Sequence, residues 1–155
     1  MPRRSAGILL YRDGRGGREF LLVHPGGPFW AKRDAGAWSI PKGLCEPGEA
    51  PLDAARREFR EELGVDPQPA QLFDLGQIKQ SGKVVQAWAF RGEWDPALLQ
   101  SLLFELEWPP KSGKRELFPE VDRAAFFDGA VANEKIITAQ RPLIERAIAW
   151  AKAQG

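Results

Sequence analysis

Three glutamates stand close together near the middle of the chain, at positions Glu58, Glu61 and Glu62. From Pro51 to Leu63 apolar residues recur at spacings of three and four, which predicts an amphipathic helix. A helix turns by about 100° per residue, so the three carboxylates share one face beside the apolar stripe. Carboxylates at such close range repel one another, and Mg²⁺ or Mn²⁺, which prefer oxygen ligands, would neutralise them. The pattern therefore predicts a site for a hard divalent cation.

The segment before this helix contains two glycines, Gly43 and Gly48. Because glycine has no side chain, carbonyl and amide groups of its backbone can approach a metal ion or a phosphate closely. Pro51 suits the first position of a helix, and Gly64 suits the left-handed residue that follows one. We expect the segment and the helix to form one site. From the helix alone, a solvated surface rich in Glu and Arg is the alternative interpretation.

The whole segment from Gly43 to Val65 resembles the Nudix box, with every fixed Gly, Glu and Arg position filled at the required spacing. Phe59 is the one departure, because the family usually has Ile, Leu or Val there. Its place in the apolar stripe predicts an effect on packing and not on chemistry. The resemblance implies an α/β (α+β) fold, namely a Nudix-type α/β/α sandwich around a mixed β-sheet. It also implies a hydrolase that uses divalent metal ions and water to cleave a phosphoanhydride bond in nucleoside diphosphate-linked substrates.

The resemblance carries further roles onto the matching positions. The residues that it implies as ligands of the catalytic cations are Glu58, Glu61, Glu62 and, through its backbone carbonyl, Gly43. Glu49 and Arg57 are implied to pair with each other and to brace the glycine-containing segment against the helix. In such a site the cations neutralise phosphate oxygens and lower the pKa of a bound water.

The carboxylate that accepts the proton of the attacking water differs among Nudix enzymes, so the resemblance leaves it open. Glu61 and Glu62 are two candidates. Glu116 and Glu120, from a later part of the chain, are two more, and ordinary surface glutamates are the alternative for both. Glu120 is the residue outside the box that we predict to be catalytic.

Substrate choice depends on residues outside the box. The stretch from Trp38 to Lys42 resembles the segment before the box in Nudix enzymes that cleave dinucleoside polyphosphates or diphosphoinositol polyphosphates. Lys42 is a candidate to bind a phosphate as a point charge, and Trp30 is a candidate platform for an adenine ring. The alternatives are an exposed loop lysine and a packing tryptophan. The best single prediction is a small-molecule dinucleoside polyphosphate such as diadenosine tetraphosphate.

Further substrates and a second class of function stay open. A downstream tyrosine marks some diadenosine polyphosphate hydrolases, but the only tyrosine here is Tyr11. Nucleoside triphosphates, nucleotide sugars and diphosphoinositol polyphosphates are therefore alternative substrates. A Nudix-like module that binds a nucleotide without cleaving it is a further hypothesis, which the complete set of box carboxylates disfavours.

The composition sets the frame for these hypotheses. A length of 155 residues with 43% hydrophobic content predicts one domain over residues 1–155. The 22 basic and 21 acidic residues leave a net charge of +1, which does not favour a polymeric nucleic acid as partner. The N-terminal apolar run is too short for a signal peptide, and no run approaches the roughly 20 apolar residues of a membrane span. We expect a cytoplasmic enzyme without a membrane partner, either monomer or homodimer.

Several single residues are expected to be structural. The lone Cys45 has no partner for an intrachain disulfide, and His24 has no second histidine with which to form a metal site. Trp88 lies in an apolar stretch and is assigned to the core. A basic group that we expect to be solvated consists of Lys111, Lys114 and Arg115.

The remaining elements must position the site. Two hairpins are predicted, one with strands at 6–11 and 20–24, and one with strands at 72–79 and 83–90 joined by Ser81-Gly82. Further strands are predicted at 38–40, 104–108 and 121–127, with a polar loop at 109–119. A final helix is predicted at 142–153. Strands interleaved with two helices, without regular alternation, indicate a mixed sheet covered by helices.

Overall fold

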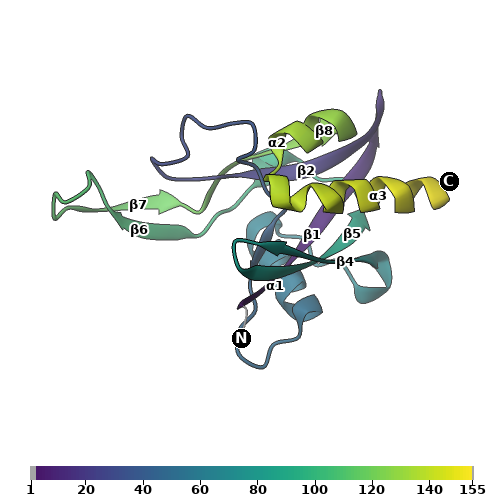
Figure 1. The fold of residues 1–155 in the computed structure, drawn as a ribbon, viewed down its shortest axis with the longest axis horizontal. Coiled ribbons are helices and arrows are strands. Elements are labelled where there is room, and N and C mark those ends of the chain that lie inside the picture. The colour runs from purple at the N-terminus through teal and green to yellow at the C-terminus, as the bar shows by residue number, and fades with distance from the viewer. Residues whose placement is uncertain (1–2, 155) are drawn as a thin grey trace.

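The computed structural model of this protein describes residues 3–154 and is shown in Figure 1. Its strands are β1 (Arg3–Gly14), β2 (Gly17–Pro25), β3 (Lys42–Leu44), β4 (Leu72–Gln80), β5 (Lys83–Arg91), β6 (Leu103–Glu107), β7 (Arg115–Pro119) and β8 (Val121–Asp128). Its helices are α1 (Pro51–Leu63), α2 (Gly129–Lys135) and α3 (Arg141–Ala153). Short 3₁₀ turns lie at Pro69–Gln71, Pro96–Leu98 and Thr138–Gln140.

One mixed sheet forms the centre of the molecule. Its strand order is β4-β5-β1-β2-β8, and β3 pairs with β1. β1 runs parallel to β5, whereas its pairings with β2 and β3 are antiparallel. Both predicted hairpins, β1–β2 and β4–β5, are confirmed. The second one turns through Ser81 and Gly82, whose φ angles of 50° and 76° are the left-handed values that a tight two-residue hairpin turn requires.

Each face of this sheet carries its own hydrophobic core. On one face α1 covers a cluster that includes Ile8 and Phe59, both fully buried. On the other face α2 and α3 cover a cluster that includes Leu9 and Leu143, also fully buried. Ile8 and Leu9 point to opposite faces because successive residues of a strand alternate. The predicted fold class, a mixed sheet between helices, is confirmed.

The short strand predicted at residues 38–40 is wrong in position. That stretch forms only isolated bridges to two other segments, and β3 begins after Pro41. Proline has no N–H to donate to a strand ladder, so pairing starts beyond it. The close approach needs a glycine in β1, because a Cβ atom on Gly7 would lie 2.5 Å from the carbonyl oxygen of Pro41. Gly43 therefore lies within a strand and not in a bend.

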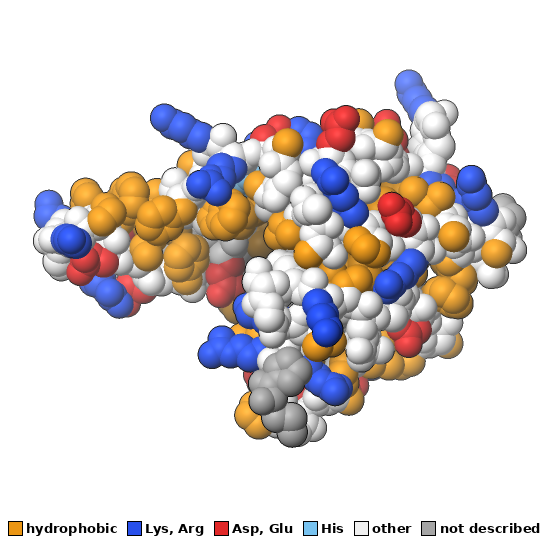
Figure 2. All heavy atoms as spheres, in the orientation of Figure 1, with side chains coloured by type: hydrophobic (Ala, Val, Ile, Leu, Met, Phe, Trp, Pro, Cys, Tyr) orange, Lys and Arg blue, Asp and Glu red, His pale blue; other side chains and the backbone are white. Residues whose placement is uncertain are grey.

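The polar loop predicted at 109–119 is also partly wrong, because its last residues form β7. β6 and β7 make a separate two-stranded sheet that projects from the body as an arm (Figure 1). Phe104 lies opposite Phe118 in this pair, with ring centroids 6.1 Å apart. Hydrophobic side chains cover much of the arm (Figure 2), and Leu117 is 64% exposed. The charged residues Arg115 and Glu116 at the start of β7 interrupt the apolar pattern by which a strand is recognised.

The two predicted helices are confirmed as α1 and α3, and α2 is an addition. The seven residues of α2 are too few to show a helical period in the sequence. Two features stabilise α2. Asp128 caps its first turn by accepting a hydrogen bond from Val131 N at 2.9 Å, and Ala132 is fully buried. Across residues 3–154, the helices are all too short or too polar to cross a membrane.

Candidate active site

Helix α1 is fixed along its inner face and at its end, and this sets where its glutamates point. Phe59 is fully buried and packs edge to face on Phe90 of β5, with ring centroids 6.1 Å apart. Gly64 ends the helix in the left-handed conformation, with a φ of 73°. Both expectations from the sequence are confirmed. With Phe59 directed into the core, Glu58 and Glu62 lie on the neighbouring face, toward β3.

The carboxylate of Glu58 lies directly against the backbone of Gly43. A Cβ atom on Gly43 would lie 2.1 Å from Cδ of Glu58 and 2.2 Å from its Oε1. Gly43 belongs to strand β3 and is paired with Ala6, so its backbone is extended and does not need glycine for its conformation. Glycine is required here for space, because any side chain would displace the Glu58 carboxylate.

Glu62 is the most deeply buried of the three glutamates on this helix, with 6% of its surface exposed. Its Oε2 atom accepts no hydrogen bond from any residue between 3 and 154. Burial, followed by the charges of Glu58, Glu120 and Glu61, raises the pKa of Glu62 to about 8. A buried acceptor without a donor is unfavourable for folding. Burial, the neighbouring negative charges and the missing donor thus all disfavour the ionised form of Glu62 in the absence of a cation.

Glu58 and Glu61 complete the acidic face of the helix. Burial raises the pKa of Glu58, and a hydrogen bond from Arg57 opposes that rise. Arg57 Nη1 donates to Glu58 Oε1 at 2.9 Å and lies 3.7 Å from Glu61 Oε1. The side chain of Glu61 is more open, at 36% exposed. Glu58 and Glu61 thus share one guanidinium, which also pairs with Glu49, and Glu62 does not contact it, so negative charge is in excess.

Arg57 is held by a two-point ion pair with Glu49, the pairing that the resemblance implied. Its Nε donates to Glu49 Oε2 at 2.9 Å and its Nη2 to Glu49 Oε1 at 3.0 Å. Nη2 also donates to the carbonyl oxygen of Leu44, at 3.1 Å. The hydrogen bond from Arg57 is the main cause that lowers the pKa of Glu49 to about 2. Together these contacts fasten the connection between β3 and α1 to the helix.

The two candidates from the later part of the chain lie in different places. Glu120 directly precedes β8, and its charge contributes to the raised pKa of both Glu58 and Glu62. It lines the same cavity as Glu62. Glu116 lies on β7 in the projecting arm, is exposed, and does not line that cavity. The structure therefore brings Glu120, and not Glu116, to the glutamates of α1.

A cavity of about 260 Å³ opens beside Glu62 and Glu120. Lys42 and Trp30, the two predicted substrate-binding residues, both line it. Burial, followed by the charge of Lys83, lowers the pKa of Lys42. The apolar part of the wall consists of Val23, Pro25, Ala37, Ile40, Val121 and Ile137. The cavity thus combines carboxylates, an ammonium group and an aromatic ring around an apolar wall.

A polar network in the wall of this cavity was not predicted from the sequence. Gln140 is fully buried and contacts Gln80, Ser39 and the backbone of Ile40. Gln80 and Gln140 are 60 residues apart in the chain. A glutamine has no spacing signal of its own, so only the folded chain shows that these residues meet.

His24 is structural, as expected, and it supports the loop that carries Trp30. It is fully buried, with Nδ1 2.8 Å from Asp122 Oδ1 and Nε2 2.6 Å from the carbonyl oxygen of Arg33. These contacts tie the loop to β8.

The predicted burial of Trp88 is also confirmed, at 8% exposed. Of the remaining residues expected to be structural or solvated, Cys45 is half-buried, and the exposed basic residues of the arm are Lys111, Lys114 and Arg115.

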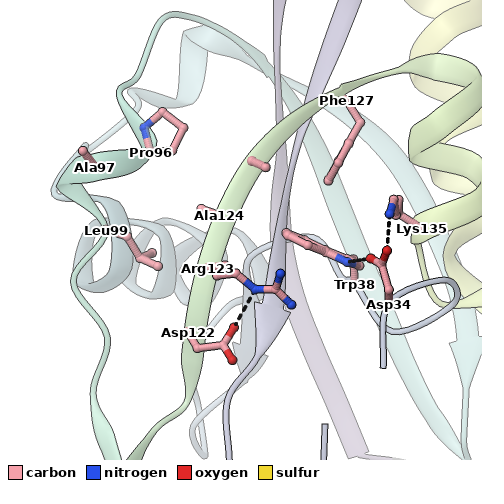
Figure 3. Close-up of a pocket in the computed structure, with 11 residues that line it drawn as sticks. Asp34, Trp38, Pro96, Ala97, Leu99, Asp122, Arg123, Ala124, Phe127 and Lys135 are labelled. Carbon is pink, nitrogen blue, oxygen red and sulfur yellow. Dashed lines mark hydrogen bonds and ion pairs between the residues drawn. The ribbon is translucent and has the colours of Figure 1, made fainter. Parts of the chain in front are cut away.

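A larger, open hollow of about 700 Å³ lies along β8 and contains no residue of the box (Figure 3). Its charged side chains are paired with one another. Asp34 accepts a hydrogen bond from Trp38 Nε1 at 2.8 Å and forms an ion pair with Lys135. Arg123 lies 3.6 Å from Asp122. Because charges that neutralise one another are poorly suited to bind a phosphate or a metal ion, we place the candidate active site at the smaller cavity.

The acidic residues fit a hard cation in their chemistry, although they are not preassembled around one. In the part of the chain that the structure describes, no three His, Cys, Asp or Glu side chains converge closely enough to hold a metal ion. Glu58 is engaged by Arg57 instead. The donor set consists of oxygens only, is crowded with negative charge, and includes the unpartnered Glu62 Oε2. We therefore expect Glu58 to rearrange when a cation binds.

Comparison with known proteins decides the family. A family model of the NUDIX domain matches residues 1–147. The chain belongs to the Nudix family. An RNA pyrophosphohydrolase of Bartonella henselae is 37% identical to this Nudix protein over 67 residues, which are 41% of this chain and 36% of that one. One of Psychrobacter cryohalolentis is 43% identical over 49 residues, 31% of this chain and 28% of that one. The matched segments thus span only about a third of these curated relatives.

Solved structures agree with this Nudix protein in fold. The Ap4A hydrolase of C. elegans in a binary complex has a TM-score of 0.64 and 23% identity, over 97% of this chain and 98% of that one. The NUDIX domain of Shewanella oneidensis NrtR, in complex with ADP ribose, has a TM-score of 0.65 and 15% identity, over 97% and 89%. The Nudix fold implied by the box is therefore confirmed.

Proposed function

We propose that this Nudix protein is a metal-dependent pyrophosphohydrolase that cleaves a phosphoanhydride bond in nucleoside diphosphate-linked substrates. The observation that carries the proposal is the buried Oε2 of Glu62, which lacks a partner in residues 3–154 and is surrounded by the charges of Glu58, Glu61 and Glu120. Concentrated negative charge of this kind opposes folding unless a cation neutralises it. A metal-binding role supplies the missing compensation.

The glutamates of α1 would hold Mg²⁺ or Mn²⁺, together with the carbonyl oxygen of Gly43. The chemistry that such an ion supplies is neutralisation of phosphate oxygens and a lower pKa for the attacking water. Arg57, held by Glu49, binds the carbonyl oxygen of Leu44, the residue after Gly43, and so fixes the end of β3 against the helix. This pair is a positioning device and does not contact the reacting atoms.

Glu120 is the proposed acceptor of the proton from the attacking water, with Glu61 and Glu62 as the competing candidates. Its support is its position, because it lines the same cavity as Glu62 and its charge influences the pKa of that residue. A carboxylate that is not engaged with the cation is better able to take up a proton.

The best candidate substrate is a dinucleoside polyphosphate such as diadenosine tetraphosphate. In this proposal Lys42 binds a phosphate and Trp30 stacks on a base, because both line the cavity beside Glu62 and Glu120. One structural neighbour is named as an Ap4A hydrolase. The curated relatives are named RNA pyrophosphohydrolases, which makes RNA a second candidate substrate, against the expectation from the net charge. Nucleoside triphosphates, nucleotide sugars and diphosphoinositol polyphosphates complete the range of candidate substrates.

A substrate panel tests the proposal. The protein with Mg²⁺ is incubated with diadenosine tetraphosphate and with each of the remaining candidate substrates, and the products are resolved by chromatography. We expect ATP and AMP from diadenosine tetraphosphate, and no products when EDTA is added. Faster cleavage of another substrate would replace the substrate assignment. Nucleotide binding without turnover of any substrate would instead indicate a binding module and refute the enzymatic proposal.

Arg57→Lys is expected to weaken Mn²⁺ binding about tenfold, since partners that orient metal ligands typically contribute roughly 10- to 100-fold. Lysine is a point donor and cannot reproduce the two-point contact with Glu49. Calorimetric titration with Mn²⁺ measures the affinity, and circular dichroism checks the fold. Arg60→Lys on the same helix is the control, because Arg60 has a single ion pair and is 53% exposed. Equal affinities for the two variants would contradict the positioning role.

A further inference from the structure

Gln80 is the last residue of β4 and lines the cavity beside Glu62. Its Oε1 atom accepts a hydrogen bond from Nε2 of Gln140 at 2.8 Å. Gln140 is fully buried, so its own hydrogen bonds have no competition from water. The two ends of an amide have opposite hydrogen-bonding character, so the chemistry that Gln80 offers to the cavity depends on which end faces it.

The backbone settles the orientation of both amides. The N–H of Ile40 can only donate, and it points at Gln140 at 3.0 Å, so that atom of Gln140 must be its oxygen, Oε1. The other end of Gln140 is then Nε2, which donates to Gln80 and to Ser39 Oγ, the latter at 3.0 Å. The Gln80 atom that receives this donor must be its oxygen. The remaining atom of Gln80 is Nε2.

The Nε2 group of Gln80 is thus a donor with a fixed direction. None of the side-chain hydrogen bonds within residues 3–154 has this Nε2 as its donor, while the oxygen of the same amide accepts from Gln140. Flipping the amide would set two N–H groups against each other, so the orientation is not free to change. A preorganised donor at a cavity wall costs little to use in binding, because folding has already fixed its direction.

The cavity has the size and lining of a site for one part of a nucleotide. Its volume of about 260 Å³ lies below the roughly 300–1,000 Å³ of sites that enclose a whole drug-sized ligand. Trp30 and the apolar wall suit a flat heteroaromatic ring, and Lys42 on the same wall suits the phosphates attached to it.

We propose that Gln80 is a specificity-determining residue whose Nε2 donates a hydrogen bond to an acceptor on the edge of a purine base in this cavity. The inference rests on the proposed function only in taking a nucleotide as the ligand. The acceptor is either a ring nitrogen, which adenine and guanine share, or the 6-oxo oxygen, which guanine alone has. A site built on hydrogen bonding disfavours ligands that leave its donor unpaired.

Two substitutions at Gln80 and one control separate the donor from its surroundings. Gln80→Glu retains the size and the acceptor for Gln140, but it turns a carboxylate oxygen toward the cavity. Gln80→Leu removes the donor without adding charge. Gln77→Glu adds the same charge at an exposed position of the same strand, and it is the matched control.

Affinities are measured by calorimetry with the Mg²⁺ complexes of adenosine and guanosine 5′-(α,β-methylene)diphosphate, which resist cleavage at that bond. We expect Kd to rise at least about tenfold in Gln80→Glu and about 3- to 10-fold in Gln80→Leu, and to stay unchanged in Gln77→Glu. A rise for both nucleotides identifies a ring nitrogen as the acceptor, and a rise for the guanosine compound alone identifies the 6-oxo oxygen.

The inference is overturned if neither nucleotide loses affinity in Gln80→Glu, or if Gln77→Glu loses as much. Because the readout is binding, its outcome does not depend on turnover, so a protein that fails the substrate panel can still pass this test. For any dinucleotide that is cleaved, the Gln80 variants are expected to raise KM more than they lower kcat. A structural defect would change the melting temperature as well, which is measured in parallel.

Discussion

Glu62→Gln is expected to lower the turnover number at least about 100-fold and, in the same protein, to raise the metal-free melting temperature at alkaline pH. The loss of rate follows from removing a charge that balances the cation. The gain in stability follows because Glu62 is buried and lacks a partner for Oε2 within residues 3–154. An ordinary structural glutamate would not show this combination, since its removal destabilises the fold.

The gain in melting temperature of Glu62→Gln depends on pH. Its direction is set by the pKa of Glu62, which folding raises from 4.5 to about 8. Below 4.5 the carboxyl is protonated in both states. Between 4.5 and about 8 the unfolded chain has released a proton that the folded protein keeps, so stability falls as pH rises. Gln cannot ionise. The metal-free melting temperature of Glu62→Gln should therefore fall less than that of the unsubstituted protein between about pH 5 and about pH 9.

The same group couples Mg²⁺ binding to proton release. Binding requires the ionised carboxylate, so affinity for Mg²⁺ should increase with pH until Glu62 is ionised, near pH 8. Calorimetry in two buffers of different ionisation enthalpy counts the protons released, and Glu62→Gln should release fewer. Glu145→Gln, at an exposed position of α3, is the control.

A Glu62→Gln protein that unfolds, or that keeps more than about a tenth of the turnover number, would refute the assignment of Glu62 as a ligand of the cation.

Gly43→Ala is expected to lower the turnover number about 10- to 100-fold with little loss of stability. The new Cβ atom would lie 2.1 Å from Cδ of Glu58, so the carboxylate must swing away from its place. That carboxylate is the free end of a flexible side chain, and the backbones of β3 and α1 can stay where they are. The substitution is therefore expected to lower the turnover number and to leave the free energy of unfolding nearly unchanged.

A double-substitution cycle tests whether Gly43→Ala acts through Glu58. If it does, the double variant Gly43→Ala/Glu58→Ala will be no slower than Glu58→Ala alone, because contacting residues do not contribute independently. Gly16→Ala is the control, since a Cβ atom there meets no other atom within 4 Å. Additive losses in the cycle would show that Gly43 acts through something other than the Glu58 carboxylate.

The elements that the sequence predicted well are those whose signal is local. The apolar stripe from Pro51 to Leu63 gave α1 its bounds, and Gly64 marked its end. The β4–β5 hairpin was recognisable from Ser81-Gly82, because left-handed turn residues form a short, specific signal. Both depend on neighbours within a few residues, which is the range over which chain sterics and helical periodicity act.

The elements that were misplaced depend on distant partners. β3 was expected before Pro41, but its position is decided by where β1 can accept a neighbour, at the side-chain-free Gly7. β7 was predicted as a loop because Arg115 and Glu116 conceal its pairing with β6. A strand has no internal hydrogen bonds, so its bounds belong to the pair and not to the strand.

By itself the sequence determined which chemistry is available: a helix with Glu58, Glu61 and Glu62 on one face, preceded by Gly43 at Nudix spacing. Helical periodicity fixes such relations, because residues three and four apart must share a face. Only the tertiary structure decided that Glu120 and not Glu116 joins them, that Glu62 is buried without a partner in residues 3–154, and that the amide of Gln80 has one orientation. Those properties arise from burial and from contacts between distant segments, which no spacing along the chain encodes.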